Sequence, residues 1–421
     1  MMKGKKLINN VIKYIFLLVF LFILSVYFIH SSDASFQNDS EGLALGRIIV
    51  EKFNLQIDTN VYGLGKLSSL SNPEDDEYAM IYYDAKKLSL EGYEYRAYKS
   101  QIGLQGMAYV LVTKIFSVFD VYHLYLYLRL ACCFFLALIL LGIVWQLYKR
   151  YGILFSLVFF AVSFMSPSIV NFSRNLYWVE FIWFIPMFLG LLCLNYENKR
   201  VFIYPLFFIA IFAKCLCGYE YVSTIMMTGI MFLTAEWFSI KEKRKELFKV
   251  IFIIGIMSVL GFAAAYVLHA YWYGDGDIIS GLKLLKVNLI ERRTFGNASD
   301  FAPVYADSLN ASVFAVLKKY LWEGDYYAGK VILLLLVITS VCLIYQNRIL
   351  HKKNIFEISL FLVALATSLS WFVLAKAHSY IHTHMNFAMW CMGFVQVCFY
   401  LIIKIILETK KIKLSLTSLE E

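Results

Sequence analysis

Residues 11–30 read VIKYIFLLVFLFILSVYFIH, and this apolar run decides the class of the fold. About 20 apolar residues in an α-helix are enough to cross the hydrocarbon core of a bilayer. The basic stretch KGKK (3–6) precedes the run, and SSDASF (31–36) follows it without a small-residue cleavage motif. We therefore expect an uncleaved first span whose N-terminus lies in the cytoplasm.

The composition extends this reading to the whole chain. Of the 421 residues, 60% are hydrophobic and 16% are charged, whereas soluble domains are about half apolar and about a quarter charged. The apolar runs are long and continuous, which excludes the short alternating segments of a β-barrel. Most basic residues behind the net charge of +9 flank these runs, so they indicate orientation and not a nucleic-acid partner.

We expect an all-α fold, a bundle of about ten transmembrane helices with both termini in the cytoplasm. Residues 1–421 would form a single integral membrane domain. The run at 201–214 is short enough to be re-entrant instead. The spans are predicted near residues 11–30, 122–147, 152–170, 177–195, 201–214, 220–238, 249–273, 330–346, 355–375 and 385–407.

The connecting loops separate into two kinds. Short basic loops such as YKRYG, YENKR and SIKEKRKELFK are typical of the cytoplasmic side. The other set contains two large loops, 31–121 and 274–329, which are then extracytoplasmic. The cytoplasmic loops are too short for a catalytic domain, and no phosphate-binding glycine motif occurs. Any chemistry is therefore expected outside.

The first large loop opens with NDSEGLALGRIIVEKF (38–53), in which Asp39 and Glu41 precede apolar residues at helical spacing. This pattern predicts an amphipathic helix at the membrane interface, and 101–119 predicts a second one. The acids alone can be explained as a cap and a first-turn residue that favour the helix dipole. A carboxylate there can also act as a general base.

The second large loop predicts a helix around 278–291 that ends in Glu291-Arg292-Arg293. Adjacent guanidinium groups suit a phosphate or pyrophosphate, whose oxygens they match bidentately. The alternative is a solvated helix C-terminus, where cations are favourable.

Other ionisable residues lie at the same predicted side. NFSRNLYWVE (171–180) holds Arg174 and Glu180, which are either functional groups or an interfacial belt. Lys214 and Glu220 flank an outer hairpin and can simply pair with each other.

KAHSYIHTH (376–384) gathers three histidines at one outer corner. On a helix, His378 and His382 share a face, so a divalent metal site is a minority alternative, without the usual H-E-x-x-H context. Neutral imidazoles that hydrogen-bond to sugar or phosphate are the favoured reading. No cofactor is otherwise expected.

The stretch NDSEGLALGRII resembles the D-E-x-x-Y-A-x-x-A opening of the first outer loop in the GT-C class of membrane glycosyltransferases, such as protein O-mannosyltransferases and aminoarabinose transferases. It departs from that pattern by the spacing D-S-E and by Leu43 in place of tyrosine. The resemblance implies a bacterial cytoplasmic-membrane enzyme that transfers sugar from a polyprenyl-phosphate donor to a glycan, lipid or protein acceptor outside, for envelope polysaccharide or glycoconjugate synthesis.

The resemblance also implies roles for residues. Asp39 would be the base, with Glu41 beside it. The donor phosphate would be held by Arg174, Lys214, Arg292 and Arg293. The substrate-binding site would be lined by Glu180, Glu220, His378 and His382.

Two other functions stay open. A flippase or transporter of lipid-linked glycans would place charges midway through several spans and show inverted repeats. An O-antigen-type polymerase would also work outside on lipid-linked glycans, with its usual large loop late in the chain.

Overall fold

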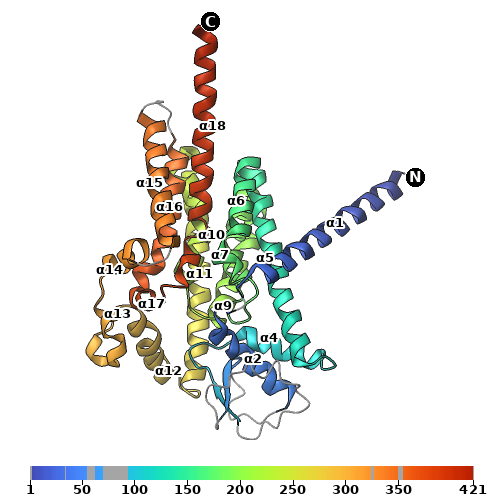
Figure 1. Ribbon diagram of the computed structural model, residues 1–421, viewed down its shortest axis with the longest axis vertical. Coiled ribbons are helices and arrows are strands. Elements are labelled where there is room, and N and C mark those ends of the chain that lie inside the picture. Colours follow the sequence, from blue (N-terminus) through green and yellow to red (C-terminus); the bar gives the residue numbers. More distant parts are fainter. Residues whose placement is uncertain are drawn as a thin grey trace. The chain divides into compact units, whose positions relative to one another are not determined.

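The structure is a computed structural model that describes residues 2–33, 35–54, 62–69, 93–323, 327–348 and 354–420. The described part is mostly helical and has one pair of antiparallel strands, which confirms the predicted helical class (Figure 1). Six helices in these ranges are long and apolar enough to cross a membrane, as in a multi-pass membrane protein. They are Tyr14–Ser31, Val121–Tyr151, Val222–Ser239, Lys241–Tyr273, Tyr327–Arg348 and Ile355–Leu374.

Helices also cover the remaining apolar runs. They are α6 (Ile153–Met165) with α7 (Pro167–Val170), α8 (Phe181–Asn195), α9 (Arg200–Leu216) and α18 (Phe394–Glu420). Two of them begin later than the sequence predicts, because the backbone turns first: Val179 has φ 41° before α8, and Gly393 has φ 134° before α18. The number of ten spans, and the sides of the loops, stay predictions.

Contacts divide the chain into two compact units. Unit 1 comprises Met1–Leu141, Ile169–Trp183 and Leu216–Gly218, and unit 2 comprises Gly142–Ser168, Phe184–Cys215 and Tyr219–Glu421. Helix α5 (Val121–Tyr151) runs through the boundary.

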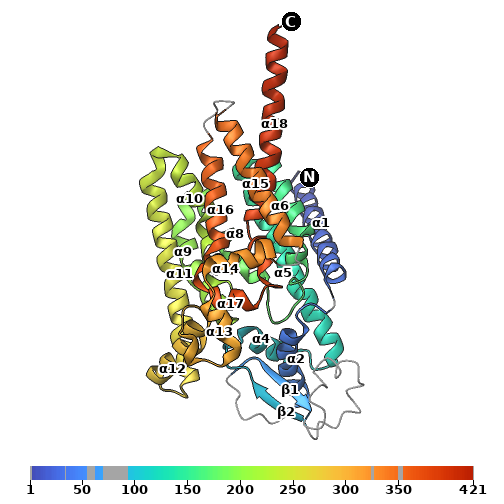
Figure 2. The same cartoon turned by 60° about the vertical axis from the view of Figure 1, so that its left-hand side comes forward.

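In unit 1, α1 (Met2–Ser31) is followed by α2 (Asn38–Lys52), the strands β1 (Gly65–Ser69) and β2 (Tyr93–Ala97), and α4 (Leu104–Ile115). The strands pair antiparallel, with Gly65 opposite Ala97. Both predicted loop helices are present. The hairpin was not predicted, and α2 packs on β1 and α4, so protein covers much of its apolar face (Figure 2).

Gly46 lets α2 approach β1. A Cβ atom on Gly46 would lie 2.5 Å from the Gly65 carbonyl oxygen, which is backbone and cannot turn away. The backbones therefore touch at a point where only glycine fits.

We predict that Gly46→Ala lowers the free energy of unfolding by about 1–3 kcal/mol, because the added methyl group forces α2 and β1 apart. Thermal unfolding of the detergent-solubilised protein measures the effect. The matched control is Gly255→Ala in α11 (Arg244–Tyr273), where an added Cβ meets no atom within 4 Å. Equal stability of the two variants would contradict the packing described.

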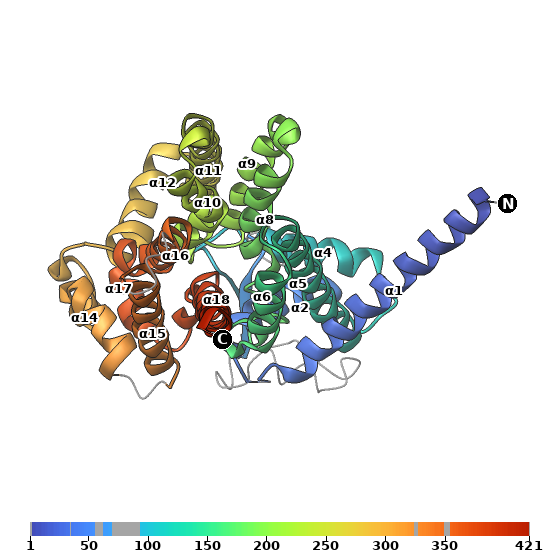
Figure 3. The same ribbon diagram turned by 90° about the horizontal axis from the view of Figure 1, so that it is seen from above.

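Unit 2 is built on α10 (Val222–Ser239), which packs between α11 and α16 (Ile355–Leu374); the end-on view shows this arrangement (Figure 3). The predicted helix of the second large loop is present as α12 (Ile278–Leu285), a π-helical turn (Lys286–Ile290) and a 3-10 turn (Glu291–Arg293).

The rest of that loop packs on the histidine corner of unit 2. It forms α13 (Ala306–Asn310) and α14 (Val313–Lys318), and both contact α17 (Lys376–Ile381). The 291–293 turn contacts α17 as well. The fold therefore joins two stretches that are far apart in the sequence.

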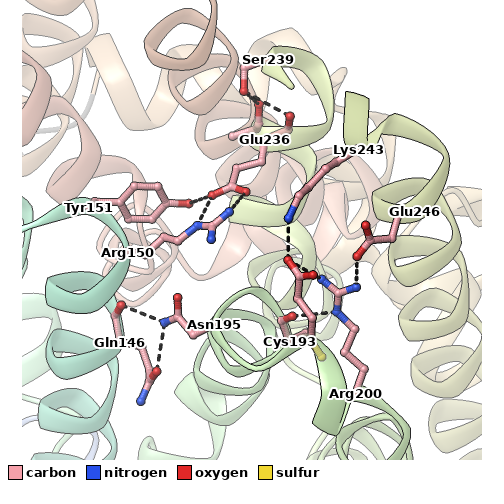
Figure 4. A network of polar contacts seen from close by, with 12 residues as sticks. Gln146, Arg150, Tyr151, Cys193, Asn195, Arg200, Glu236, Ser239, Lys243 and Glu246 are labelled. Carbon is pink, nitrogen blue, oxygen red and sulfur yellow. Dashed lines mark hydrogen bonds and ion pairs between the residues drawn. The ribbon is translucent and has the colours of Figure 1, made fainter. Parts of the chain in front are cut away.

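A polar network ties together helix ends in unit 2 (Figure 4). Arg150 at the end of α5 binds the Glu236 carboxylate of α10 through two N–H groups, and the Tyr151 hydroxyl donates to the same carboxylate at 3.0 Å. Lys243 binds Glu197 at 2.7 Å. Basic residues that the sequence assigns to cytoplasmic loops thus clamp neighbouring helices together.

Candidate functional site

The two units divide the predicted site residues between them. Unit 1 holds Asp39, Glu41, Arg174 and Glu180, and unit 2 holds Lys214, Glu220, Arg292, Arg293, His378 and His382.

Glu41 is a buried carboxylate that receives hydrogen bonds from three neighbours. The Arg129 guanidinium binds both of its oxygens, with Nε 2.9 Å from Oε1. The Tyr125 hydroxyl donates to Oε2 at 3.2 Å, and the Leu176 backbone N–H donates to Oε1 at 3.0 Å. With its side chain 1% exposed, Glu41 joins α2, α5 and the 171–180 segment.

Arg129 was not predicted as a site residue, although its positive charge is what allows the Glu41 carboxylate to be buried. It lies within the apolar helix α5, one turn after Tyr125, whose ring it covers at 4.0 Å. A lone arginine inside a span is a signal in itself, because such a charge is tolerated only with a partner.

Asp39 has a different environment from Glu41. Its side chain is exposed in the first turn of α2, and no hydrogen bond or ion pair of Asp39 occurs among the described residues. The residue before the helix, Gln37, makes no capping bond through its side chain. The carboxylate of Asp39 is therefore accessible, and its place in the first turn of α2 also favours the helix dipole.

Arg174 lies in the non-helical segment between α7 and α8. It donates to the carbonyl oxygens of Ile29 at 3.4 Å and Asp33 at 2.9 Å, so it caps the end of α1. Burial lowers the pKa of Arg174, and the positive charge of Arg129 lowers it further. The carboxylate of Glu41 acts in the opposite direction and partly offsets these effects.

Glu180 follows directly after a strained residue. Val179 is β-branched and has φ 41°, a conformation that costs energy and concentrates at functional sites. The Glu180 side chain is buried, and its Oε2 atom has no hydrogen-bond partner within the described ranges. An acid in this state is a functional candidate.

We predict that Glu41→Gln lowers the free energy of unfolding by about 3–5 kcal/mol, because it leaves the buried Arg129 without its counter-charge. The matched control is Asp39→Asn, at an exposed site on the same helix, which should unfold like wild type. Chemical or thermal unfolding in detergent distinguishes them. If Glu41→Gln is as stable as Asp39→Asn, the ion pair does not hold unit 1 together.

In unit 2, Glu220 and Arg293 form a buried ion pair. Their side chains are 8% and 9% exposed, and Nη1 of Arg293 lies 2.9 Å from Oε1 of Glu220. Burial alone would raise the pKa of Glu220, but the positive charges of Arg293 and Lys214 hold it below its ordinary value. Glu220 is therefore ionised. The positive charge of Lys214 acts on Glu220, as the sequence allows, and Arg293 contacts it directly.

His378 and His382 lie beside this pair. Their ring centroids are 4.4 Å apart. Burial lowers the pKa of His378 well below its usual value, and the charges of Arg293, His382 and Arg292 act in the same direction. The Nδ1 atom of His378 has no partner among the described residues. His378 is thus a neutral imidazole whose buried Nδ1 atom has no hydrogen-bond partner in the described ranges.

The second large loop holds the histidine corner in place. The Tyr320 hydroxyl lies 2.7 Å from the Ser379 carbonyl oxygen and 3.0 Å from that of His382. The Lys376 ammonium donates to the carbonyl oxygens of Leu309 and Ala311, each at 2.6 Å. Sequence reasoning missed Tyr320, because one more tyrosine in a Tyr-rich chain carries no signal.

A pocket with a volume of about 270 Å³ opens next to the ion pair. Arg293 and Thr294 lie on its wall, and the other lining side chains are mostly aromatic or aliphatic. Trp371 lines the pocket and stands edge-on to His378, with ring centroids 5.8 Å apart. The pocket can therefore take an apolar group while Arg293 on its wall contacts an attached anion. We name Arg293, Glu220, His378, His382 and this pocket the Arg293 site.

In the described ranges, no three His, Cys, Asp or Glu side chains lie close enough together to hold an ion.

Comparisons with protein-family models, with curated proteins and with solved structures found no match to this chain. The site must therefore be interpreted from its own chemistry.

The low pKa of His378 gives a pH dependence with a defined sign. The unfolded chain binds a proton at His378 near pH 6.5, whereas the folded chain does not. We predict that acidification below about pH 6.5 destabilises the protein, with a contribution from His378 of up to about 1.4 kcal/mol per pH unit. Unfolding measured from pH 7.5 to 5 should show a shallower acid slope in His378→Asn. An unchanged slope would show that His378 is not held neutral.

Proposed function

We propose that the protein is a GT-C-type glycosyltransferase. It would transfer a sugar from a polyprenyl-phosphate-linked donor to an acceptor on the extracytoplasmic side of the bacterial cytoplasmic membrane, in the synthesis of envelope polysaccharide or glycoconjugates.

One observation carries the proposal: the Arg293 site combines cationic and neutral hydrogen-bonding groups with an apolar pocket. A guanidinium matches phosphate oxygens with a planar fork, and Glu220 fixes its orientation. Neutral His378 and His382 can add hydrogen bonds without adding charge. Aromatic and aliphatic walls suit a hydrocarbon chain. A ligand with both features is a lipid phosphate.

Asp39 and Glu41 of unit 1 differ in how well each could act as the general base. Glu41 is buried and both of its oxygens already accept hydrogen bonds from Arg129 and other neighbours, so it is poorly placed to contact an acceptor hydroxyl. Asp39 is exposed and has no such partner in the described part of the chain. We assign the base to Asp39 and a structural role to Glu41.

The assigned reaction balances as a displacement. Asp39 accepts the proton of the acceptor hydroxyl as its oxygen attacks the anomeric carbon. The bond from that carbon to the phosphate oxygen breaks, and the electron pair leaves with polyprenyl phosphate. Cations that bind the leaving phosphate stabilise the charge that develops on it.

We predict that Arg293→Lys weakens the binding of undecaprenyl phosphate about tenfold, because lysine keeps the charge but loses the bidentate fork. Retaining a cation also keeps a partner for Glu220, so the fold should survive. The control is Arg244→Lys in α11, where the guanidinium donates to the Phe238 carbonyl oxygen in a different part of unit 2. Equal affinities of both variants would remove the phosphate role from Arg293.

A panel of radiolabelled undecaprenyl-phosphate sugars tests the reaction itself. We predict that wild type releases or transfers sugar from one donor, and that Asp39→Asn binds this donor but reduces turnover at least about a hundredfold, the effect of losing a general base. The Ser40→Ala variant, one residue along α2, should stay active. Binding without turnover in wild type would favour a flippase, and full activity of Asp39→Asn would contradict the assigned base.

A further inference from the structure

A second apolar pocket continues along the same helix pair as the Arg293 site. It has a volume of about 330 Å³ and lies between α10 and α16. From α10 it is lined by Met227, Ile230, Thr234 and Phe238, and from α16 by residues that include Leu362 and Ala366. The pocket of the Arg293 site is lined by Val222 and Ser223 of α10 and by Trp371 and Leu374 of α16.

The two pockets follow one face of α10. Ser223, Met227, Ile230, Thr234 and Phe238 are separated by three or four residues, which places them on one side of a helix. These side chains are half-buried or exposed, while their neighbours on the other faces are mostly buried. The two pockets therefore lie in line along one side of the α10–α16 pair, and we name this line the α10–α16 seam.

Hydroxyl groups hold the seam together between the two pockets. The Ser370 hydroxyl lies 3.2 Å from that of Ser223 and 3.3 Å from that of Thr224. This bridge fixes the spacing of the two helices at Ser370 and Ser223, so the packing along the seam is well defined.

The length of the seam restricts its occupant. From Val222 to Phe238 an α-helix rises about 24 Å, whereas the whole hydrocarbon core of a bilayer is about 30 Å thick. One leaflet accounts for about half of that thickness, about 15 Å. A seam that starts at the Arg293 site and follows α10 to Phe238 is therefore longer than one leaflet is thick. The acyl chain of an ordinary phospholipid extends over about one leaflet, and a polyisoprenoid chain is longer.

We propose that the α10–α16 seam binds the polyisoprenoid chain of a lipid phosphate whose head lies at the Arg293 site. That the phosphate binds at the Arg293 site rests on the proposed function. The seam adds the path of the lipid chain and the reason why that chain must be long. Arg293 provides charge complementarity at one end of the seam, and apolar walls provide the rest.

Photolabelling tests the path of the chain. The full-length protein in detergent is irradiated with undecaprenyl phosphate that carries a diazirine within its chain, and labelled residues are identified by mass spectrometry. We expect label on Met227, Ile230 and Ala366, displaced by unlabelled undecaprenyl phosphate and not by phosphatidylglycerol. Equal labelling of Val259, an exposed residue of α11 outside both pockets, or equal displacement by phosphatidylglycerol, would overturn the proposal.

A pair of variants tests the energetic role of the seam. Ala366→Phe fills the second pocket, and Val259→Phe adds the same group to an exposed face of α11. We expect Ala366→Phe to weaken undecaprenyl phosphate binding about tenfold, as expected for losing the burial of about two CH₂ groups, and to leave farnesyl phosphate binding unchanged. Met227→Trp is the second blocking variant if Ala366→Phe does not fold.

The outcomes separate the two proposals. If Arg293→Lys weakens binding but neither blocking variant does, the phosphate site stands and the seam is wrong. If no lipid phosphate binds in a manner that depends on Arg293, the proposed function fails, and the chain path fails with it.

Discussion

A charge buried in an apolar helical protein persists only with a partner, and this constraint organises the structure. In unit 1 the pair is Glu41 and Arg129, which joins α2 to α5. In unit 2 it is Glu220 and Arg293, which joins the turn before α10 to the second large loop. Each pair fixes a segment that the apolar helices alone would leave without a defined position.

The same constraint separates structural groups from reactive ones. Charges that are fully satisfied by neighbours, such as Glu41 and Glu236, stabilise helix contacts. Groups that keep an accessible or unsatisfied atom among the described residues, such as Asp39, Glu180 and His378, retain the capacity to bind or exchange a proton. Arg293 combines both properties: its charge is paired with Glu220, and its side chain still lines a pocket.

Hydrophobic patterning predicted the helices well, because long apolar runs leave few alternatives in a membrane. It also predicted the loop helices that begin near Asn38 and Ile278. The β1–β2 hairpin was missed, since its strands are short and far apart in the chain. Arg129 and Tyr320 were missed for another reason: their roles depend on partners brought close only by the fold.

The central claim is that the Arg293 site binds the phosphate of a long-chain lipid. The most direct measurement is an experimentally determined structure of the full-length protein with undecaprenyl phosphate. The account predicts a phosphate within hydrogen-bond distance of Arg293 and a chain that follows α10 and α16. A phosphate bound elsewhere, with the Arg293 site and the seam both empty of lipid, would contradict it.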